Sequence, residues 1–430
     1  MNELKTEYNT VENESIEITL SGDEVQAIRE LRKKISEKTN SIDDENQNDI
    51  NQVVVKPEIS ISRSLDDDDS YEIKVNNAIG QIVLGERVIN IAPKIGSNHF
   101  IEIYSKNKNK YKDLAIYKNQ GTADSGDLLF LILFDFLEGV EDVVKKGIRK
   151  GYKLVNEELK FIKGHVNVLK TTRNLLSGKL AIDTDYEEFS IDTPLNRLIK
   201  SALFEIKTLH SSESLHVTSS DFIETLVSKA SKLYNHFEFI PDYLASDLRV
   251  NVDRNTKYYE QALVGAKNIL QSYGAEVTVG DITASARMMN TFMVIENGLR
   301  YFLNQNLPEK FMCNSKPTSK NSRDGKYSFN PDLVFGTIAE NIATGDIKYK
   351  YWTSQNKFSR GDLQQSITFT NAYKVQKGII IGFSDSSFNP SKYHDKIGDI
   401  DFFVSTWDTG KDPSKASQKL LEQITDILKS

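Results

Sequence analysis

The feature of this 430-residue sequence that most constrains its fold is a regular alternation of strand-like and helix-like segments in the last third. Short apolar, β-branched runs alternate there with longer segments that repeat apolar residues at helical spacing. The expected strands are residues 331–335, 341–349, 378–383 and 399–404, and the expected helices are residues 361–374 and 413–428. Strands that alternate with helices in this way predict an α/β layer built on a mixed sheet.

Two carboxylates and a lysine are placed to meet on the first two of these strands. Asp346 and Lys348 are two residues apart, so their side chains point to the same face of a strand. Asp332 reaches the same place if the two strands form a hairpin. Such carboxylates can bind Mg²⁺ or Mn²⁺, and the lysine can orient or help deprotonate a water that attacks a phosphodiester. A surface cluster of salt bridges is the alternative interpretation of so short a pattern.

A glutamine after these strands and a glutamate before them extend the pattern. Gln365 lies near the start of the helix that follows the second strand. The order strand–strand–helix–strand, with these residues, resembles the PD-(D/E)xK nuclease core, a fold family that tends to carry an acid on the helix before the first strand. Glu296 is the candidate for that acid. The resemblance implies that Asp332, Asp346, Lys348, Gln365 and Glu296 are catalytic and that Asp332 and Asp346 are the metal ligands.

Composition and periodicity divide the preceding residues into two further stretches. Residues 1–70 hold 18 Asp and Glu against 8 Lys and Arg and few apolar residues, which predicts an acidic, partly disordered extension. One short helix is expected within it, from Ser21 to Ile35, capped by Ser21 and Glu24. Residues 71–280 begin with β-branched runs and continue with helical periodicity, which predicts a β-rich head and a helical middle.

Two smaller expectations complete this division of the chain. A strand-like stretch is expected at residues 161–169. A helix is expected from about residue 281, carrying Met288, Phe292, Ile295, Leu299 and Phe302 at helical spacing. The α/β nuclease-like domain is accordingly expected to span residues 281–430.

Separated motifs run in a fixed order through the chain from residue 71 onward. They are INIAPKI at residues 89–95, FIKGHV at 161–166, YEEFSIDTPLNRLIK at 186–200, DIKYK at 346–350 and GDLQQ at 361–365. Over roughly residues 71–430 the chain therefore resembles the McrC family, the nuclease subunits of McrBC-type restriction systems. It departs from the family's usual pattern at two positions: the acid after Met289-Asn290 is Glu296, two positions late, and Gln364 stands where a tyrosine is common.

The resemblance implies a division of labour with a second protein. McrC-like nucleases work with an McrB-like AAA+ subunit that hydrolyses GTP, forms a ring, recognises double-stranded DNA and translocates it. The head and the helical middle of residues 71–280 would engage that ring, with Asn196 and Arg197 as candidate contacts. A helix start at Thr193-Pro194 is the structural alternative for the same residues. The Walker-like string at residues 80–87 lacks the Lys-Ser/Thr of a nucleotide site.

Two functions of different class follow from this resemblance. The first is a Mg²⁺-dependent DNA endonuclease subunit of a GTP-driven restriction complex, which also stimulates its partner's GTPase. The alternative is a non-catalytic adaptor that binds and activates a AAA+ ring. A free-standing repair nuclease leaves the McrC-like head and middle unexplained.

Basic residues around the expected nuclease strands are candidate DNA contacts. Between Lys310 and Lys377 there are 11 Lys and Arg against 5 Asp and Glu, although the whole chain has a net charge of −7. The candidates for phosphate contacts are Lys316, Lys320, Arg323, Lys326 and Lys350. An ordinary solvated loop is the alternative interpretation of the first four.

The composition also limits where in the cell the protein is expected and which kinds of metal site it can form. No apolar run approaches the ~18–20 residues of a membrane span, and the first residues lack the pattern of a signal peptide, so we expect a cytoplasmic protein. The single cysteine, Cys313, excludes an intramolecular disulfide framework and a multi-cysteine zinc site.

Overall fold

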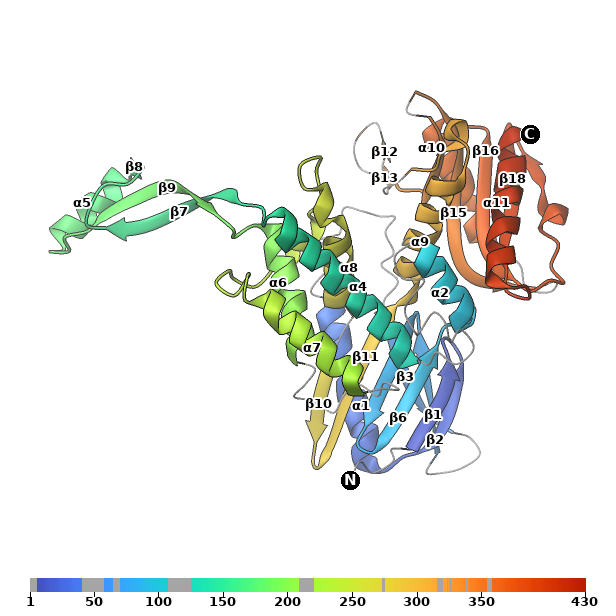
Figure 1. Cartoon of the computed structure of the whole chain (residues 1–430), viewed down its shortest axis with the longest axis horizontal. Coiled ribbons are helices and arrows are strands. Elements are labelled where there is room, and N and C mark those ends of the chain that lie inside the picture. The colour runs from blue at the N-terminus through green and yellow to red at the C-terminus, as the bar shows by residue number, and fades with distance from the viewer. Residues whose placement is uncertain are drawn as a thin grey trace. The chain divides into compact units, whose positions relative to one another are not determined.

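The computed structural model describes residues 6–40, 58–64, 70–106, 125–208, 220–272, 275–314, 320–322, 324, 327–337, 339–353 and 358–430. The chain forms two compact units, and the second is inserted into the first (Figure 1). The first unit comprises Met1–Leu129, Ser214–Thr218 and Ser272–Ser430, and the second comprises Phe130–Glu213 and Ser219–Gln271. Within the described ranges, no helix is long and apolar enough to cross a membrane.

The head of the first unit is built from two sheets and one helix. The larger sheet has the order β1 (Thr6–Val11), β6 (Arg87–Ala92), β5 (Ala78–Leu84), β11 (Ile282–Asn290) and β10 (Ala275–Val279). The smaller has the order β2 (Ser15–Thr19), β4 (Ser70–Asn76) and β3 (Glu58–Arg63). Helix α1 (Gly22–Asn40) packs against both, and Ile28, Ile73, Ile82 and Met288 share one apolar core. Burial of these side chains is the main force that holds the head together.

The described part of the first 70 residues forms more regular structure than its composition led us to expect. Helix α1 confirms the expected capping box, because the Ser21 amide donates to Glu24 Oε2 at 2.8 Å and the Glu24 amide donates to Ser21 Oγ at 3.3 Å. Apolar residues are few here, but Ile28 and Leu31 recur at helical spacing and are fully buried. The expected disorder elsewhere in this stretch, including the acidic run at residues 66–69, lies largely outside the described residues.

The helix expected from about residue 281 begins only at Thr291, so that expectation was wrong for nine residues. Residues 282–290 form β11 instead, which pairs antiparallel with β5 and places Asn290 opposite Ala78. Apolar and polar residues do alternate from Ile282 to Met288, which is a strand pattern. The expected helix began too early because Met288 also continues the helical spacing of Phe292, Ile295 and Leu299. The head sheet therefore extends past residue 281, where we expected the nuclease-like domain to begin.

The last third has the predicted mixed sheet, which confirms the α/β fold class. Its order is β14 (Leu333–Gly336), β15 (Asn341–Trp352), β16 (Lys377–Ser384), β18 (Ile400–Asp408) and β17 (Asp395–Ile397). The pairs β15–β16 and β16–β18 are parallel, and the two outer pairs are antiparallel. Helix α10 (Arg360–Tyr373) packs on β15 and β16, and α11 (Pro413–Lys429) packs on β18.

Helices α2 (Ser97–Lys106) and α9 (Thr291–Asn306) connect the head to this sheet. The two helices pack on one another, and α2 also contacts α11. His99 of α2 makes the most specific of these contacts: its Nδ1 accepts a hydrogen bond from Trp407 Nε1 at 2.9 Å, and its Nε2 lies 3.0 Å from the Thr409 carbonyl oxygen. The head and the nuclease-like sheet are thus parts of one compact unit.

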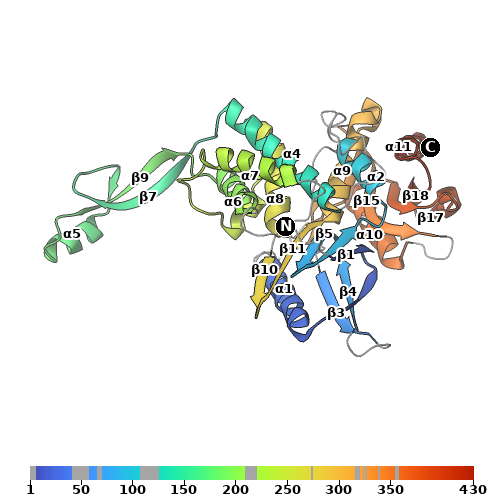
Figure 2. The same ribbon diagram turned by 60° about the horizontal axis from the view of Figure 1, so that its bottom comes forward.

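The second unit consists of helices and a β arm. The helices are α6 (Pro194–Lys207), α7 (Ser220–Tyr234), α4 (Ser125–Lys146) from Phe130 onward and α8 (Glu260–Ser272) up to Gln271. Helices α4 and α8 approach closely at Gly139 and Gly265, where a Cβ atom would lie 2.8 Å from atoms of the facing helix. The arm, residues 151–190, contains β7 (Gly151–Leu159), β8 (His165–Val166), α5 (Val168–Leu176) and β9 (Ile182–Ser190), and it extends away from the helices of its own unit (Figure 2).

The strand expected at residues 161–169 is largely absent from the arm. Only His165–Val166 is a strand there, and Asn167 begins α5 by accepting a hydrogen bond from the Lys170 amide at 3.2 Å. An asparagine side chain that caps a helix in this way competes with strand pairing. The long strands of the arm are β7 and β9, which flank this stretch.

Candidate functional site

The β14–β15 hairpin brings three of the predicted residues together. Leu333 pairs with Gly345, so Asp332 and Asp346 lie at adjoining positions on the two strands. Asp332 Oδ2 accepts a hydrogen bond from the Ile347 amide at 2.7 Å. The Lys348 ammonium lies 2.7 Å from Asp346 Oδ2, as expected for side chains that share one face of a strand.

Helix α10 adds Gln365 to this group. The helix begins with a capping box, in which the Asp362 amide donates to Ser359 Oγ and the Ser359 amide donates to Asp362 Oδ2. Gln365 lies on the second turn of the helix and points toward β15. Gln365 Oε1 accepts a hydrogen bond from Lys348 Nζ at 2.8 Å. The ammonium is therefore held by one carboxylate and one amide oxygen, which fixes its position.

Helix α9 adds Glu296 and a residue that the sequence analysis missed. The Glu296 carboxyl interacts with Asp332, Asp346 and Lys348. Arg300, one turn later, is 4% exposed, and its Nε donates to the Asp332 carbonyl oxygen at 2.8 Å. The spacing of four residues between Glu296 and Arg300 is the signal that could have pointed to the arginine.

The three carboxylates of this site resist ionisation. Burial, and then the charge of Glu296, raises the pKa of Asp332 to about 7. Burial and the charge of Asp332 raise the pKa of Asp346 to about 8. Burial also raises the pKa of Glu296 to about 7, although the Arg300 guanidinium acts in the opposite direction. Full ionisation of the three carboxylates would leave one negative charge more than Lys348 and Arg300 balance, which is why ionisation is disfavoured.

The carboxylate oxygens of Asp332 and Asp346 are of the kind that could hold a divalent cation. Among the described residues, no three His, Cys, Asp or Glu side chains are arranged as a ready-made metal site. Mg²⁺ does not require one, because it keeps several waters and needs only one or two protein carboxylates. Hard oxygen donors that repel one another in a buried setting are the donor set that such an ion stabilises.

The candidate DNA contacts are placed only in part. Lys316, Arg323 and Lys326 lie outside the described residues. Lys320 forms part of β12 (Lys320–Asn321), and its ammonium lies 4.5 Å from the centroid of the Tyr373 ring. Lys350 donates to both oxygens of Asp362 at 2.9 Å, so its charge is already engaged in an ion pair at the start of α10.

The expectation that Asn196 contacts a partner was wrong. Asn196 is fully buried in the second unit, where its Nδ2 donates to the carbonyl oxygens of Arg149 and Ile191, and its Oδ1 accepts from Tyr259 at 2.9 Å. All of its hydrogen-bonding capacity is thus directed inward. The capping interpretation explains this start of α6, since Thr193 accepts from the Asn196 amide and Pro194 occupies the first turn.

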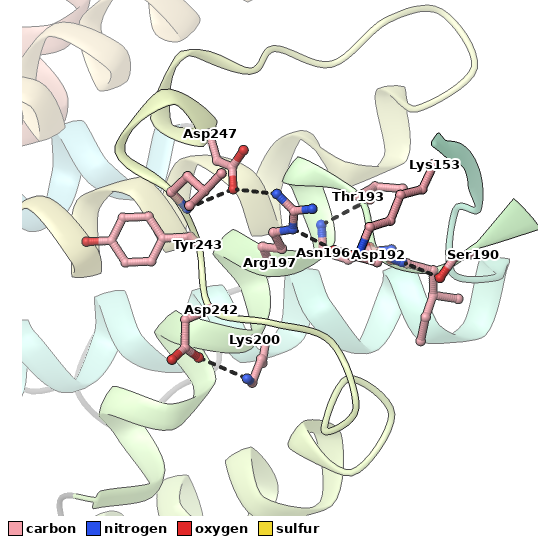
Figure 3. Close-up of polar contacts among 12 residues, drawn as sticks. Lys153, Ser190, Asp192, Thr193, Asn196, Arg197, Lys200, Asp242, Tyr243 and Asp247 are labelled. Carbon is pink, nitrogen blue, oxygen red and sulfur yellow. Dashed lines mark hydrogen bonds and ion pairs between the residues drawn. The ribbon is translucent and has the colours of Figure 1, made fainter. Parts of the chain in front are cut away.

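Arg197 is also engaged within its own unit (Figure 3). Its Nε lies 2.5 Å from Asp192 Oδ1, and its Nη1 lies 3.5 Å from Asp247 Oδ2. Lys153 of β7 reaches the second oxygen of Asp192 at 2.5 Å. This ion-pair network, defined as Lys153, Asp192, Arg197 and Asp247, ties the root of the arm to α6.

Comparison with known proteins identifies the family of the chain. The model of one family, described as "McrBC 5-methylcytosine restriction system component", matches residues 73–381. The chain belongs to this family. The resemblance carried by its separated motifs is therefore confirmed. A search of curated proteins gave no match.

Two solved structures are similar to this McrBC family member. One is a half-complex from a tetradecameric assembly of Thermococcus gammatolerans McrB AAA+ hexamers with bound McrC, with 17% identity and a TM-score of 0.49 over 98% of this chain and 100% of that chain. The other is the Thermococcus gammatolerans McrBC complex, with 15% identity and a TM-score of 0.37 over 69% of this chain and 86% of that chain.

In this McrBC family member, the arm exposes an unusual amount of apolar surface. Leu169, Leu176 and Leu180 are each at least 84% exposed, and no residue of α5 is buried. The other large apolar side chains that the arm exposes are Tyr152, Leu154, Phe161, Ile162, Val168, Leu175 and Phe189. Apolar side chains gathered on one exposed element indicate a protein-binding surface.

Proposed function

We propose that this chain is the McrC-type nuclease subunit of a GTP-driven restriction complex and that it cleaves DNA with Mg²⁺ or Mn²⁺. The observation that carries the proposal is the convergence of Asp332, Asp346, Lys348, Gln365 and Glu296 at one end of the β14–β15 hairpin. A structural cluster of salt bridges would pair opposite charges, whereas this site buries three carboxylates that raise one another's pKa.

Each residue has a role that follows from its position. Asp332 and Asp346 would hold the cation, which supplies electrostatic stabilisation of the charge that develops on the phosphate. Lys348, fixed by Gln365, would orient the attacking water and stabilise the negative charge that develops on it as its proton leaves to solvent. Glu296 would help to position Asp332. The positive charge of Arg300 would offset part of the negative charge of the Glu296 and Asp332 carboxylates.

The partner in this proposal is an McrB-like AAA+ ring that hydrolyses GTP and brings double-stranded DNA to the nuclease. The exposed apolar side chains of the arm support it, because they offer a surface that another protein would cover. Arg197 would then act indirectly, by fixing the root of the arm. We expect the complex to work in the cytoplasm, where phage DNA is accessible.

Plasmid cleavage by the chain with its ring partner, GTP and Mg²⁺ tests the proposal. Wild type should cleave, and Asp346→Ala and Lys348→Ala should not. Asp395→Ala, at an exposed position of β17 in the same sheet, is the matched control and should cleave like wild type. Equal cleavage by all four proteins would place the active site elsewhere. If none cleaves but GTP turnover by the ring still rises on addition of this chain, the chain is an adaptor.

A further inference from the structure

A buried carboxylate in the head touches both elements that carry the candidate active site. Glu12 follows β1 directly and is 1% exposed. Its Oε1 accepts a hydrogen bond from Thr291 Oγ1 at 2.5 Å. Thr291 is the first residue of α9, and Glu296 lies five residues later on the same helix. Glu12 therefore holds the start of the helix that brings Glu296 and Arg300 to the site.

The other side of this carboxylate faces β15. Tyr349 follows Lys348 directly and is 5% exposed. Burial raises the pKa of Glu12, and the interaction with Tyr349 offsets part of that rise. Glu12 and the Tyr349 hydroxyl are close enough to interact, but within the described residues neither Glu12 Oε2 nor that hydroxyl makes a hydrogen bond of ordinary geometry. The Lys94 ammonium completes the cluster, lying 3.9 Å from the centroid of the Tyr349 ring and interacting with the charge of Glu12.

Stability alone does not explain this cluster. Burial of a carboxylate and an ammonium costs free energy that their attraction only partly returns, and apolar side chains of similar size would often serve as well. Burial raises the pKa of Glu12 and lowers that of Lys94, so both groups are held in a setting that disfavours their charges. A buried polar group does, however, fix the relative positions of its partners, because a shift would leave it unpaired.

We propose that Glu12 is a positioning residue that sets the spacing between α9 and β15, and so between Glu296 and the Asp346–Lys348 pair. Its two contacts lie on different elements, each within five residues of an active-site side chain. The proposal also gives a role to Lys94 of the INIAPKI motif and to Tyr349 of the DIKYK motif. It rests on the proposed nuclease function for its catalytic consequence, but its effect on metal binding can be measured separately.

The test uses the full chain and two readouts. Mn²⁺ affinity of the isolated chain is measured by electron paramagnetic resonance, and DNA cleavage is measured with the ring partner and GTP. Glu12→Ala should weaken Mn²⁺ binding and lower kcat, each by about tenfold or more, with little change in KM for DNA. Glu12→Gln keeps an acceptor for Thr291 and should recover part of both losses. Glu14→Ala, at an exposed position two residues away, is the matched control and should match wild type.

Variants of the partner residue keep the test decisive if Glu12→Ala does not fold. Thr291→Val removes the hydroxyl at nearly constant volume and should reproduce the losses, whereas Thr291→Ser should restore wild-type behaviour. Folded Glu12→Gln and Thr291→Val proteins with wild-type Mn²⁺ affinity and kcat would overturn the proposal. A wild-type chain that binds Mn²⁺ through Asp346 without cleaving would overturn only the nuclease function, and the Mn²⁺ affinities of the variants would then decide on Glu12.

Discussion

The candidate active site and the root of the arm bury similar charged side chains in opposite arrangements. At the active site, burial and mutual repulsion raise the pKa values of Asp332 and Asp346. At the root, Asp192 is also desolvated, but its contacts with Arg197 and Lys153 lower its pKa. The difference teaches how to separate two kinds of buried charge. Opposite charges in direct contact hold a structure, whereas like charges gathered together mark a place where a ligand supplies the missing charge.

The strongest test of this comparison is Asp346→Asn. Removal of one repelling carboxylate should reduce cleavage on the order of a thousandfold, because a metal ligand is lost. The same change should raise the Tm of the metal-free chain, since a costly buried charge is gone. Cleavage assays and thermal denaturation in a chelator measure the two effects. A fall in Tm would show that the carboxylate is structural and would break the comparison.

The opposite result is expected at the root of the arm. Asp192→Asn should lower the free energy of unfolding of the second unit by about 2 kcal/mol, because Arg197 and Lys153 lose their shared partner. Asp242→Asn is the control, since Asp242 pairs with Lys200 but is 84% exposed, and it should cost less than about 0.5 kcal/mol. Urea denaturation measures both. Equal effects at the two positions would contradict the assignment of the network as structural.

The buried neutral ring of His99 gives a further test of how burial acts on a titratable group. Burial lowers the pKa of His99, whose neutral ring accepts from Trp407 and faces the Thr409 carbonyl oxygen. The folded state therefore binds a proton less readily than the unfolded state. Stability of the first unit should be complete above the ordinary histidine pKa of about 6.5 and decrease as pH falls below it. Thermal denaturation between about pH 7 and about pH 5 should show this decrease in wild type. His99→Gln should show less of it.

The smallest expected effect concerns the basic residues that we predict to contact DNA phosphates. If Lys316 and Lys320 contact phosphates, Lys316→Gln together with Lys320→Gln should reduce the slope of log affinity against log salt by about 2. Lys392→Gln with Lys396→Gln, at exposed positions of the same unit, is the control. Fluorescence anisotropy with a DNA duplex measures both slopes. An unchanged slope in the first variant would remove this loop from the DNA path.

Local sequence patterns were sufficient for the elements of the last third and for the placement of Asp332, Asp346, Lys348 and Gln365. Their placement follows from strand alternation and hairpin geometry, which are local rules. β11 carries a local strand pattern from Ile282 to Met288, but its pairing with β5, about 200 residues earlier, could not be predicted from local sequence. The inward role of Asn196 likewise depends on Arg149 and Tyr259, which are distant in the sequence. Arg300 was missed because no strand or motif rule refers to it.

The insertion of one unit into another has a consequence for how this protein is made. β5 emerges from the ribosome long before its neighbour β11, and the whole second unit is synthesised between them. The head sheet therefore remains incomplete, with an unpaired edge, until residues 282–290 are available. Early folding of the inserted unit would shorten the loop that must close and so reduce the entropy lost when β11 joins β5. A destabilised inserted unit would thus delay completion of the head sheet during synthesis.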